Sequence, residues 1–373
     1  MTDEGSTARG DRAPGRHAPE GSGRPFAITF LVGAAALTVA LAGLRSVADI
    51  VGPVFLALVL TVTVHPIRRR LERTRMPEAV ASLLMLVLAY LILVLLTLAL
   101  TVSVAQLASL LPEYTEEITD TVADLGGGLA SLGVDQKQID TVVDAVDPGS
   151  LVGVAVSLLS STLSVLTDLF FVITVLLFMA FDTNGTRRNL ALLGDRFPDP
   201  VAALASFARG ARSYMGVSAT FGFIVAVIDG VVLYFMGVPG AFVWAVLAFV
   251  TNFIPNIGFV IGVIPPAAIA LLEGGPSLML AVIVVYSVIN FVIQSIIQPR
   301  VVGDAVGFSA TLTFLSLVFW AWLLGPLGAL LAVPLSLLTR ALLVEADPRA
   351  RWALPLLAGK VPPEEPTPAT AQD

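Results

Sequence analysis

Long apolar runs recur along most of the chain, and they restrict its possible folds more than any other feature. Several runs approach about 20 residues, the length that an α-helix needs to cross the hydrocarbon core of a bilayer. Hydrophobic residues make up 56% of the 373 residues and charged residues only 13%, whereas a soluble domain carries about 25% charged residues. The sequence therefore predicts an all-α polytopic membrane protein.

The residue inventory leaves few kinds of chemistry open. The chain has no cysteine and only two histidines, His17 and His65, so we expect no disulfide, no thiolate and no His-rich metal site. It also lacks the HExxH, GxSxG and phosphate-binding GxxxxGK[ST] motifs. We therefore expect no enzyme activity, no cofactor and no metal. Any transport is expected to be driven by a gradient instead of by ATP hydrolysis.

Charge is distributed unevenly and indicates the topology. Residues 106–150 hold nine acids and one base, Lys137, a charge of −8, so the rest of the chain carries +1 of the net −7. The acidity belongs to one segment, and we expect no nucleic-acid partner. Five arginines, in contrast, lie in the short segment 65–75 after the second apolar run. Because basic residues concentrate in cytoplasmic loops, this segment predicts that the N-terminal tail lies in the cytoplasm. The basic residues of the last segment, Arg340, Arg349, Arg351 and Lys360, predict the same for the C-terminus.

Composition shifts divide the chain into seven parts. The expected order is a disordered cytoplasmic tail (1–25), three transmembrane helices (26–105), an acidic extracytoplasmic cap of two amphipathic helices (106–150), a transmembrane helix (151–181), a cytoplasmic amphipathic helix region (182–213), a transport core (214–343) and a cytoplasmic tail (344–373).

The transport core contains apolar segments that are too short to span. The pairs 241–254 with 257–272, and 308–324 with 327–343, have about 14 to 17 residues each, fewer than a core about 30 Å thick requires. Each pair is joined by a Pro/Gly-rich tip, so we expect two re-entrant hairpins that enter from opposite sides. With a preceding span each, they form an inverted repeat of 214–272 and 277–343, an architecture typical of secondary transporters. Full crossings would leave the positions of the termini unchanged, and the segment lengths favour hairpins.

Residues 252–275 and 289–338 carry a specific resemblance. Their IPNIG sequence, Gln–Pro–Gly segment and GPLG…AVP sequence resemble the autoinducer-2 exporter family of bacterial membrane proteins, and the likeness extends over about residues 26–345. The resemblance implies an inner-membrane exporter or permease that forms a homo-oligomer, a pentamer, in the lipid bilayer. Family members have been linked to autoinducer-2 export, and others resemble sodium or lithium/proton antiporters. The implied partners are a small polar solute or a monovalent cation and proton.

Two groups of polar or helix-breaking residues lie at membrane depth, where exposed backbone and polar side chains are costly unless they line a path. The first is the tip of the first hairpin, where amides and free carbonyls would bind solute hydroxyls or a cation, or would only make the turn. The second is a row of amides at helical spacing that ends in a proline, which lines a path or hydrogen-bonds another helix. The two groups are Asn252, Pro255, Asn256 and Gly258, and Asn290, Gln294, Gln298 and Pro299.

Two carboxyl groups inside apolar runs are candidates for ion or proton coupling. Desolvation favours the neutral form of a carboxyl group, and Asp229 is the stronger candidate, unless it lies hydrated near the outer interface. Asp168 is the second candidate, unless it marks a helix bend or faces a cavity. In the second hairpin, Ser309 and Thr311 would contact solute or cap the helix, and the tip consists of Gly325, Pro326 and Gly328.

Three hypotheses therefore stand at the level of sequence. The first is a gradient-driven exporter of a small polar solute that works by alternating access. The second is a Na⁺(Li⁺)/H⁺ antiporter that uses Asp229 and Asp168. The third is a membrane scaffold that transports nothing. The row of amides favours the first over the second, and the broken helices disfavour the third, because a scaffold has no need of them.

Overall fold

The structure is a computed structural model, and it describes residues 26–72, 169–179, 191–255, 257–298 and 307–357, with single positions between 80 and 102 and between 182 and 190. The predictions for the N-terminal tail, the acidic cap, Asp168, Asn256, Pro299 and the last residues of the C-terminal tail lie outside the described residues.

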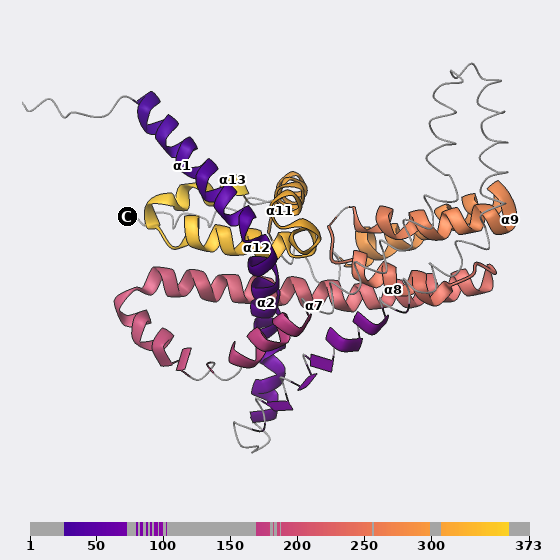
Figure 1. Ribbon diagram of the computed structural model, residues 1–373, viewed down its shortest axis with the longest axis horizontal. Coiled ribbons are helices and arrows are strands. Elements are labelled where there is room, and N and C mark those ends of the chain that lie inside the picture. The colour runs from indigo at the N-terminus through magenta and orange to yellow at the C-terminus, as the bar shows by residue number, and fades with distance from the viewer. Residues whose placement is uncertain are drawn as a thin grey trace, which may run out of the picture. The chain divides into compact units, whose positions relative to one another are not determined.

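Helices form the regular structure of the described residues (Figure 1). In chain order they are α1 (Phe26–Ser46), α2 (Ala48–Glu72), α7 (Pro198–Phe235), α8 (Ala241–Thr251), α9 (Gly258–Asn290), the π-helix η1 (Phe291–Ile297), α11 (Ala310–Leu330), α12 (Ala332–Arg340), the π-helix η2 (Ala341–Glu345), the 3-10 helix η3 (Pro348–Ala353) and α13 (Leu354–Leu357).

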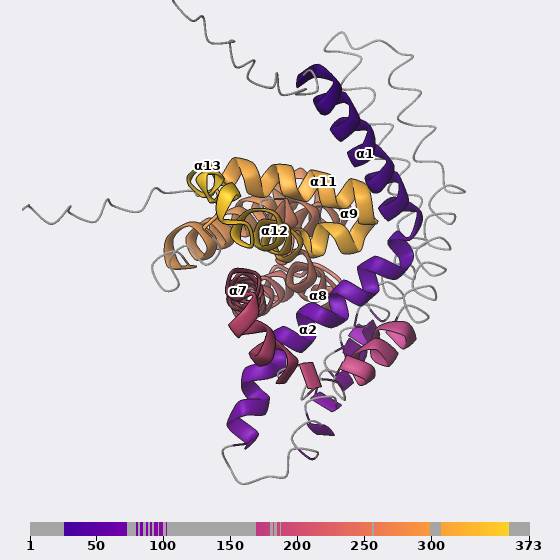
Figure 2. The ribbon, with the colours of Figure 1, turned by 90° about the vertical axis from the view of Figure 1, so that its left-hand side faces the viewer.

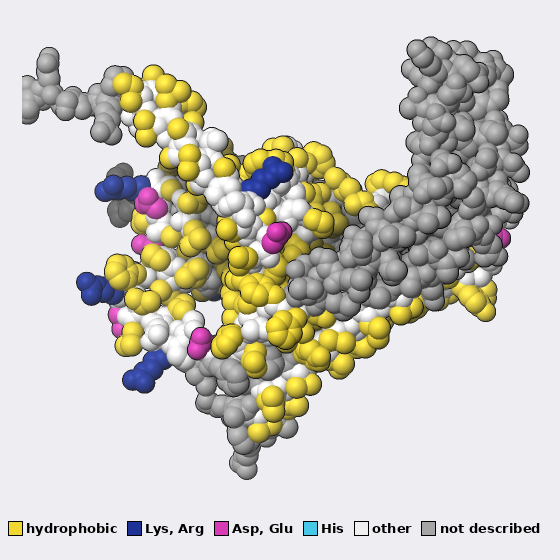
Figure 3. Space-filling view, in the orientation of Figure 1, with side chains coloured by type: hydrophobic (Ala, Val, Ile, Leu, Met, Phe, Trp, Pro, Cys, Tyr) yellow, Lys and Arg dark blue, Asp and Glu magenta, His cyan; other side chains and the backbone are white. Residues whose placement is uncertain are grey.

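Four stretches in the described residues are long and apolar enough to cross a membrane: Ala27–Ser46, Pro198–Phe235, Gly258–Ile297 and Ala310–Leu330. Hydrophobic side chains also cover much of the described surface in Figure 3. On α7, for example, Phe223 and Phe235 are 63% and 82% exposed. Water-soluble surfaces rarely carry such continuous apolar area, whereas lipid favours it. The predicted all-α polytopic membrane fold is confirmed.

The chain forms two compact units, Met1–Ser46 and Val47–Asp373. The first contains α1, whose described side chains are almost all exposed, and the second contains the remaining helices. Within the second unit, α2 packs against both α7 and α11. The Phe55 ring lies 6.2 Å from that of Phe207, and the Arg212 Nε atom donates a hydrogen bond of 3.2 Å to the Val62 carbonyl.

The longest helix, α7, begins with prolines in its first turn and continues for 38 residues without a break. Proline suits that position because the first amides of a helix have no partner within it. At 1.5 Å per residue the helix is about 57 Å long. The end of the predicted amphipathic region (182–213) and the span that follows it therefore form one continuous helix. Its buried residues Ser218, Gly222, Val225 and Asp229 recur at helical spacing, and they therefore present one face to α8 and α9.

A first helical hairpin consists of α8 and the first part of α9. The turn before it, GVPG at 237–240, has left-handed backbone at Gly237 and Gly240, a conformation that glycine adopts readily. Its tip is tightly closed: a Cβ atom at Gly258 would lie 1.9 Å from the carbonyl oxygen of Thr251, so only glycine fits there. After Glu273, α9 breaks at Gly275, where φ is 71°, and a second segment then leads to Asn290.

A second hairpin consists of α11 and α12, which lie side by side in Figure 2. Within α11 the backbone leaves helical geometry at Gly325, where φ is 66°. At Gly328 a Cβ atom would lie 1.9 Å from the Trp320 carbonyl oxygen, the same kind of close approach as at the first tip. Across the hairpin, Trp320 Nε1 donates a hydrogen bond of 2.9 Å to Ser336 Oγ. Both predicted interruptions are therefore sharp turns between packed helices.

Candidate transport site

A small cavity lies where α7, the first hairpin and the second segment of α9 meet. Its volume is about 10 Å³, which is about the space that one water molecule needs. Polar side chains from all of these elements face it, although the surrounding helices are strongly apolar. The lining residues are Val225, Asp229, Ala248, Thr251, Asn252, Phe259, Gly262, Tyr286, Asn290 and Gln294.

Three of the predicted amides form one hydrogen-bond network in this cavity. Gln294 Nε2 donates to Asn252 Oδ1 at 3.1 Å and to Asn290 Oδ1 at 2.8 Å. Asn252 Nδ2 donates in turn to the Ser218 carbonyl of α7 at 2.9 Å. The network thus joins the tip of the first hairpin, the span that follows α9's break, and α7.

The backbone around this network is shaped for close approach. A Cβ atom at Gly222 would lie 2.8 Å from Asn252 Nδ2, so glycine lets α7 come within hydrogen-bonding distance of the amide. The tip is held by Tyr214, whose hydroxyl donates a hydrogen bond of 2.9 Å to the Phe253 carbonyl. This bond satisfies a carbonyl that the end of α8 would otherwise leave free.

Gln294 lies on a π-helix, η1, which begins directly after Asn290. A π-helix closes hydrogen bonds between residues five apart, is rare, and occurs often at functional sites. The wider turn changes the register of the residues that follow it. Gln298 is half-buried and is not among the residues that line the cavity, so two of the three amides in the predicted row are brought together.

Asp229 faces the same cavity from α7. Its side chain is fully buried, and neither carboxylate oxygen has a hydrogen-bond partner among the described residues. A buried carboxyl group without a partner is costly, and native proteins rarely retain one without a functional reason. The Asp229 side chain is therefore shielded from solvent by the surrounding helices and lines the same cavity as the amide network.

Sequence reasoning missed two lining residues with polar side chains, Tyr286 and Thr251. Tyr286 is 2% exposed, and its hydroxyl is buried without a hydrogen-bond partner. A weak signal existed, because Tyr286 precedes Asn290 by four residues and so extends the polar row by one turn. Thr251 directly precedes Asn252, and its hydroxyl donates to the Ala248 carbonyl at 3.4 Å.

The other predicted positions lie elsewhere. Pro255 and Gly258 belong to the turn of the first hairpin. Ser309 is the N-cap of α11, where its Oγ accepts a hydrogen bond of 3.2 Å from the Leu312 amide. Thr311, two residues after Ser309, is exposed, and Gly325, Pro326 and Gly328 form the break and tip of the second hairpin. None of these side chains is among those lining the cavity.

Comparison with known proteins identifies the family. Residues 27–346 match the profile described as AI-2E family transporter. The chain belongs to the AI-2E transporter family. Among its relatives is the AI-2 transport protein TqsA of Escherichia coli, 31% identical over 82% of this chain and 88% of the relative. Another is the "Putative transport protein" of Haemophilus influenzae, 29% identical over 87% of this chain and 94% of the relative.

This membership makes the chain a multi-pass membrane transporter. The matched region contains both hairpins and every residue that lines the cavity. It ends at residue 346, so η3 and α13 lie beyond it.

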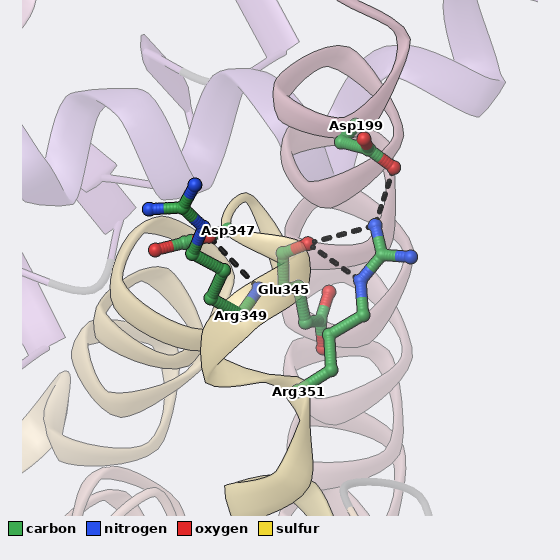
Figure 4. A network of polar contacts seen from close by, with 5 residues as sticks. All are labelled: Asp199, Glu345, Asp347, Arg349 and Arg351. Carbon is green, nitrogen blue, oxygen red and sulfur yellow. Dashed lines mark hydrogen bonds and ion pairs between the residues drawn. The ribbon is translucent and has the colours of Figure 1, made fainter. Parts of the chain in front are cut away.

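In this AI-2E transporter a polar network links η3, which lies beyond the matched residues, to α7 (Figure 4). The Arg351 guanidinium pairs with the Asp199 carboxylate, in the first turn of α7. It also donates to the Glu345 carbonyl, at 3.3 Å from Nε and 3.2 Å from Nη2. Glu345 itself pairs with Arg340 at 2.8 Å. Arg351 thus links the start of α7, before the transport core, to the segment that follows the core.

Proposed function

We propose that this AI-2E transporter is a gradient-driven exporter of a small polar solute that works by alternating access. The observation that carries the proposal is the amide network of Asn252, Asn290 and Gln294, because it joins three separate helical segments deep inside an apolar bundle. Amides both donate and accept hydrogen bonds, so they match the hydroxyl groups of an uncharged polar solute. Opening the network would expose these groups toward a solute.

The architecture supports a moving carrier. Each hairpin has a glycine tip in contact with backbone of the preceding helix, at Gly258 and Gly328. We infer that the hairpins are re-entrant, that they enter from opposite sides, and that residues 214–272 and 277–343 form an inverted repeat. In such transporters the two repeats rock against each other around a site near the midplane. The acidic cap and the cytoplasmic position of both termini remain part of this proposal.

The name of the E. coli relative suggests the first solute to test. That protein is named an AI-2 transport protein, and autoinducer-2 is a small molecule with several hydroxyl groups, which the amide network suits. The purified protein would be reconstituted into vesicles preloaded with autoinducer-2, and efflux would be followed with and without a pH gradient. Gradient-dependent efflux is expected. Efflux equal to that of protein-free vesicles, for autoinducer-2 and for a panel of other polyols, would contradict the proposal.

A specific observation favours a second function, Na⁺(Li⁺)/H⁺ antiport. Asp229 is fully buried and unpartnered among the described residues, as expected of a group that exchanges a proton for a cation. In the same vesicles, antiport would appear as proton movement on addition of Na⁺ or Li⁺. Proton movement that ignores both ions would exclude the antiporter. A scaffold would move neither solute nor ions.

Re-entrance of the hairpins can be tested in this cysteine-free chain. Single cysteines would replace Asn256 and Leu327, one in each hairpin tip, in inside-out and right-side-out vesicles. The proposal expects an aqueous thiol reagent to reach both positions through a polar path. A cysteine at Phe223, which is 63% exposed on the apolar face of α7, is the matched control and should stay unlabelled. If both tip cysteines are inert from both sides, the hairpins are not re-entrant.

A further inference from the structure

Two buried polar groups in the cavity lack partners, and they come from different helices. Asp229 on α7 and Tyr286 on α9 are 0% and 2% exposed, and the two carboxylate oxygens and the phenolic oxygen accept or donate no hydrogen bond among the described residues. Every amide side chain on the same wall is paired, and so is the Thr251 hydroxyl. The unmet hydrogen-bonding capacity of the cavity is therefore concentrated on one carboxyl group and one hydroxyl group.

The size of the cavity restricts what these groups can bind. At about 10 Å³ it accommodates one water-sized species and no larger molecule. A solute with several hydroxyl groups cannot enter it without opening the helices. The space between Asp229 and Tyr286 thus holds one water-sized species, whereas a solute needs the wider path that opening of the amide network would create.

We propose that Tyr286 is a positioning residue, which holds one water molecule against the Asp229 carboxyl group for proton exchange. The proposal rests on the proposed coupling role of Asp229. In the exchange, the O–H bond of the neutral carboxylic acid breaks and the proton passes to the water, which leaves as hydronium, while Tyr286 keeps its own proton. A phenol both donates and accepts, so it can accept from the water when Asp229 is neutral and donate to it when Asp229 is charged.

The surroundings of Tyr286 suit a fixed position. Its ring belongs to the buried core cluster that includes Leu233, Trp244 and Val263, so close packing prevents the hydroxyl from turning away. Among the lining residues, Asp229 and Tyr286 are the ones with titratable side chains. No other charged group in the described lining therefore competes for the proton.

One contact links this pair to the solute path. Asn290 Nδ2 donates a hydrogen bond of 3.0 Å to the Tyr286 carbonyl, and Asn290 Oδ1 accepts from Gln294. A solute that pulls Gln294 away from Asn290 would therefore act on the turn that carries Tyr286. This gives a direct physical route between solute binding and proton exchange.

The test is Tyr286→Phe, which deletes the hydroxyl and keeps the ring in the core. Gradient-driven flux would be measured in vesicles across a range of pH, beside Tyr234→Phe as control, because Tyr234 is 73% exposed on the same bundle. We expect Tyr286→Phe to lower the rate about tenfold and to move the midpoint of the pH profile upward by about one unit, since the charged carboxylate loses a hydrogen-bonded neighbour. Tyr234→Phe should behave as wild type.

The outcomes separate the inference from the function on which it rests. If Asp229→Asn leaves the pH profile unchanged, the coupling role of Asp229 is refuted. If Asp229→Asn changes the profile and Tyr286→Phe does not, the positioning role alone is refuted. A change in the Na⁺ concentration for half-maximal rate without a change in pH profile would also refute it, in favour of a cation site.

A spectroscopic measurement covers the case in which Tyr286→Phe does not fold. Infrared difference spectra of the wild-type protein after a pH jump should contain a protonated-carboxyl band and a tyrosine C–O band that titrate together. Both should disappear in Asp229→Asn. A carboxyl band that titrates without any tyrosine band would overturn the proposal.

Discussion

Gln294 Nε2 donates a hydrogen bond of 3.1 Å to Asn252 Oδ1 across 42 residues of sequence. This bond connects a π-helix to the end of α8, so it crosses between two segments that an inverted-repeat carrier would move relative to each other. In a low-dielectric interior such a bond is strong, but breaking it leaves costly unpaired groups unless a solute replaces it. We therefore expect a bound solute to replace the Gln294–Asn252 hydrogen bond with hydrogen bonds to the solute itself.

The pair predicts non-additive effects on transport. Asn252→Ala and Gln294→Ala should each lower solute efflux about tenfold or more, the effect of losing one buried hydrogen bond at the site. The double variant should lose less than the sum of the two single losses, because both single variants remove the shared Gln294–Asn252 bond. Thr220→Ala is a suitable control, since this exposed hydroxyl donates to the Gly216 carbonyl of its own helix and takes no part in the amide network. Fully additive losses would mean that the two amides act separately.

Gly222 should be sensitive to the smallest possible substitution. In Gly222→Ala the new Cβ atom would lie 2.8 Å from Asn252 Nδ2 and 3.1 Å from Asn252 Cβ, so the amide has to move away from Gln294. We expect a loss of efflux similar to that of Asn252→Ala.

Gly216→Ala, six residues earlier on α7, meets nothing within 4 Å and provides the matched control. Alanine favours the helix over glycine by about 0.5–1 kcal/mol, so this control should keep its activity and unfold at an equal or higher temperature. Equal efflux from both variants would show that the position of the Asn252 amide is unimportant.

The parts of this site that sequence predicts are those with a local signature. Asn252, Asn290 and Gln294 are conspicuous as amides inside apolar runs, and Asp229 as a carboxyl group in one. Tyr286 has only a weak signature, its spacing of four residues from Asn290, because a single tyrosine in an apolar helix is usually a core residue. Only the packing of α9 against α7 brings its hydroxyl to the cavity. The sequence of the π-helix, FVIQSII, likewise contains no signal for this conformation. Its wider turn shifts Gln298 out of line with Asn290 and Gln294.

The two hairpin tips should be the least tolerant positions in the transport core. In Gly258→Ala and Gly328→Ala the Cβ atom would lie 1.9 Å from a backbone carbonyl oxygen, and a backbone atom cannot move away as a side chain does. We expect each substitution to destabilise the protein by about 3 kcal/mol or more, visible as loss of the monodisperse peak in fluorescence-detected size exclusion. Gly33→Ala on α1, with nothing within 4 Å, should express normally. A monodisperse Gly258→Ala or Gly328→Ala variant would contradict the tip geometry.

The link between Arg351 and Asp199 should be weak, salt-sensitive and replaceable. Both side chains are more than 40% exposed, so Arg351→Ala should lower stability by no more than about 1 kcal/mol. Because salt screens exposed charges, the difference in melting temperature from wild type should shrink as the NaCl concentration rises.

Asp199→Ala should behave like Arg351→Ala, and the charge-reversed double variant Asp199→Arg with Arg351→Asp should recover part of the loss. The recovery should be incomplete, since the reversed pair cannot donate to the Glu345 carbonyl, which accepts from Arg351 in the native chain. A salt-independent loss would instead assign the role of Arg351 to that carbonyl contact alone.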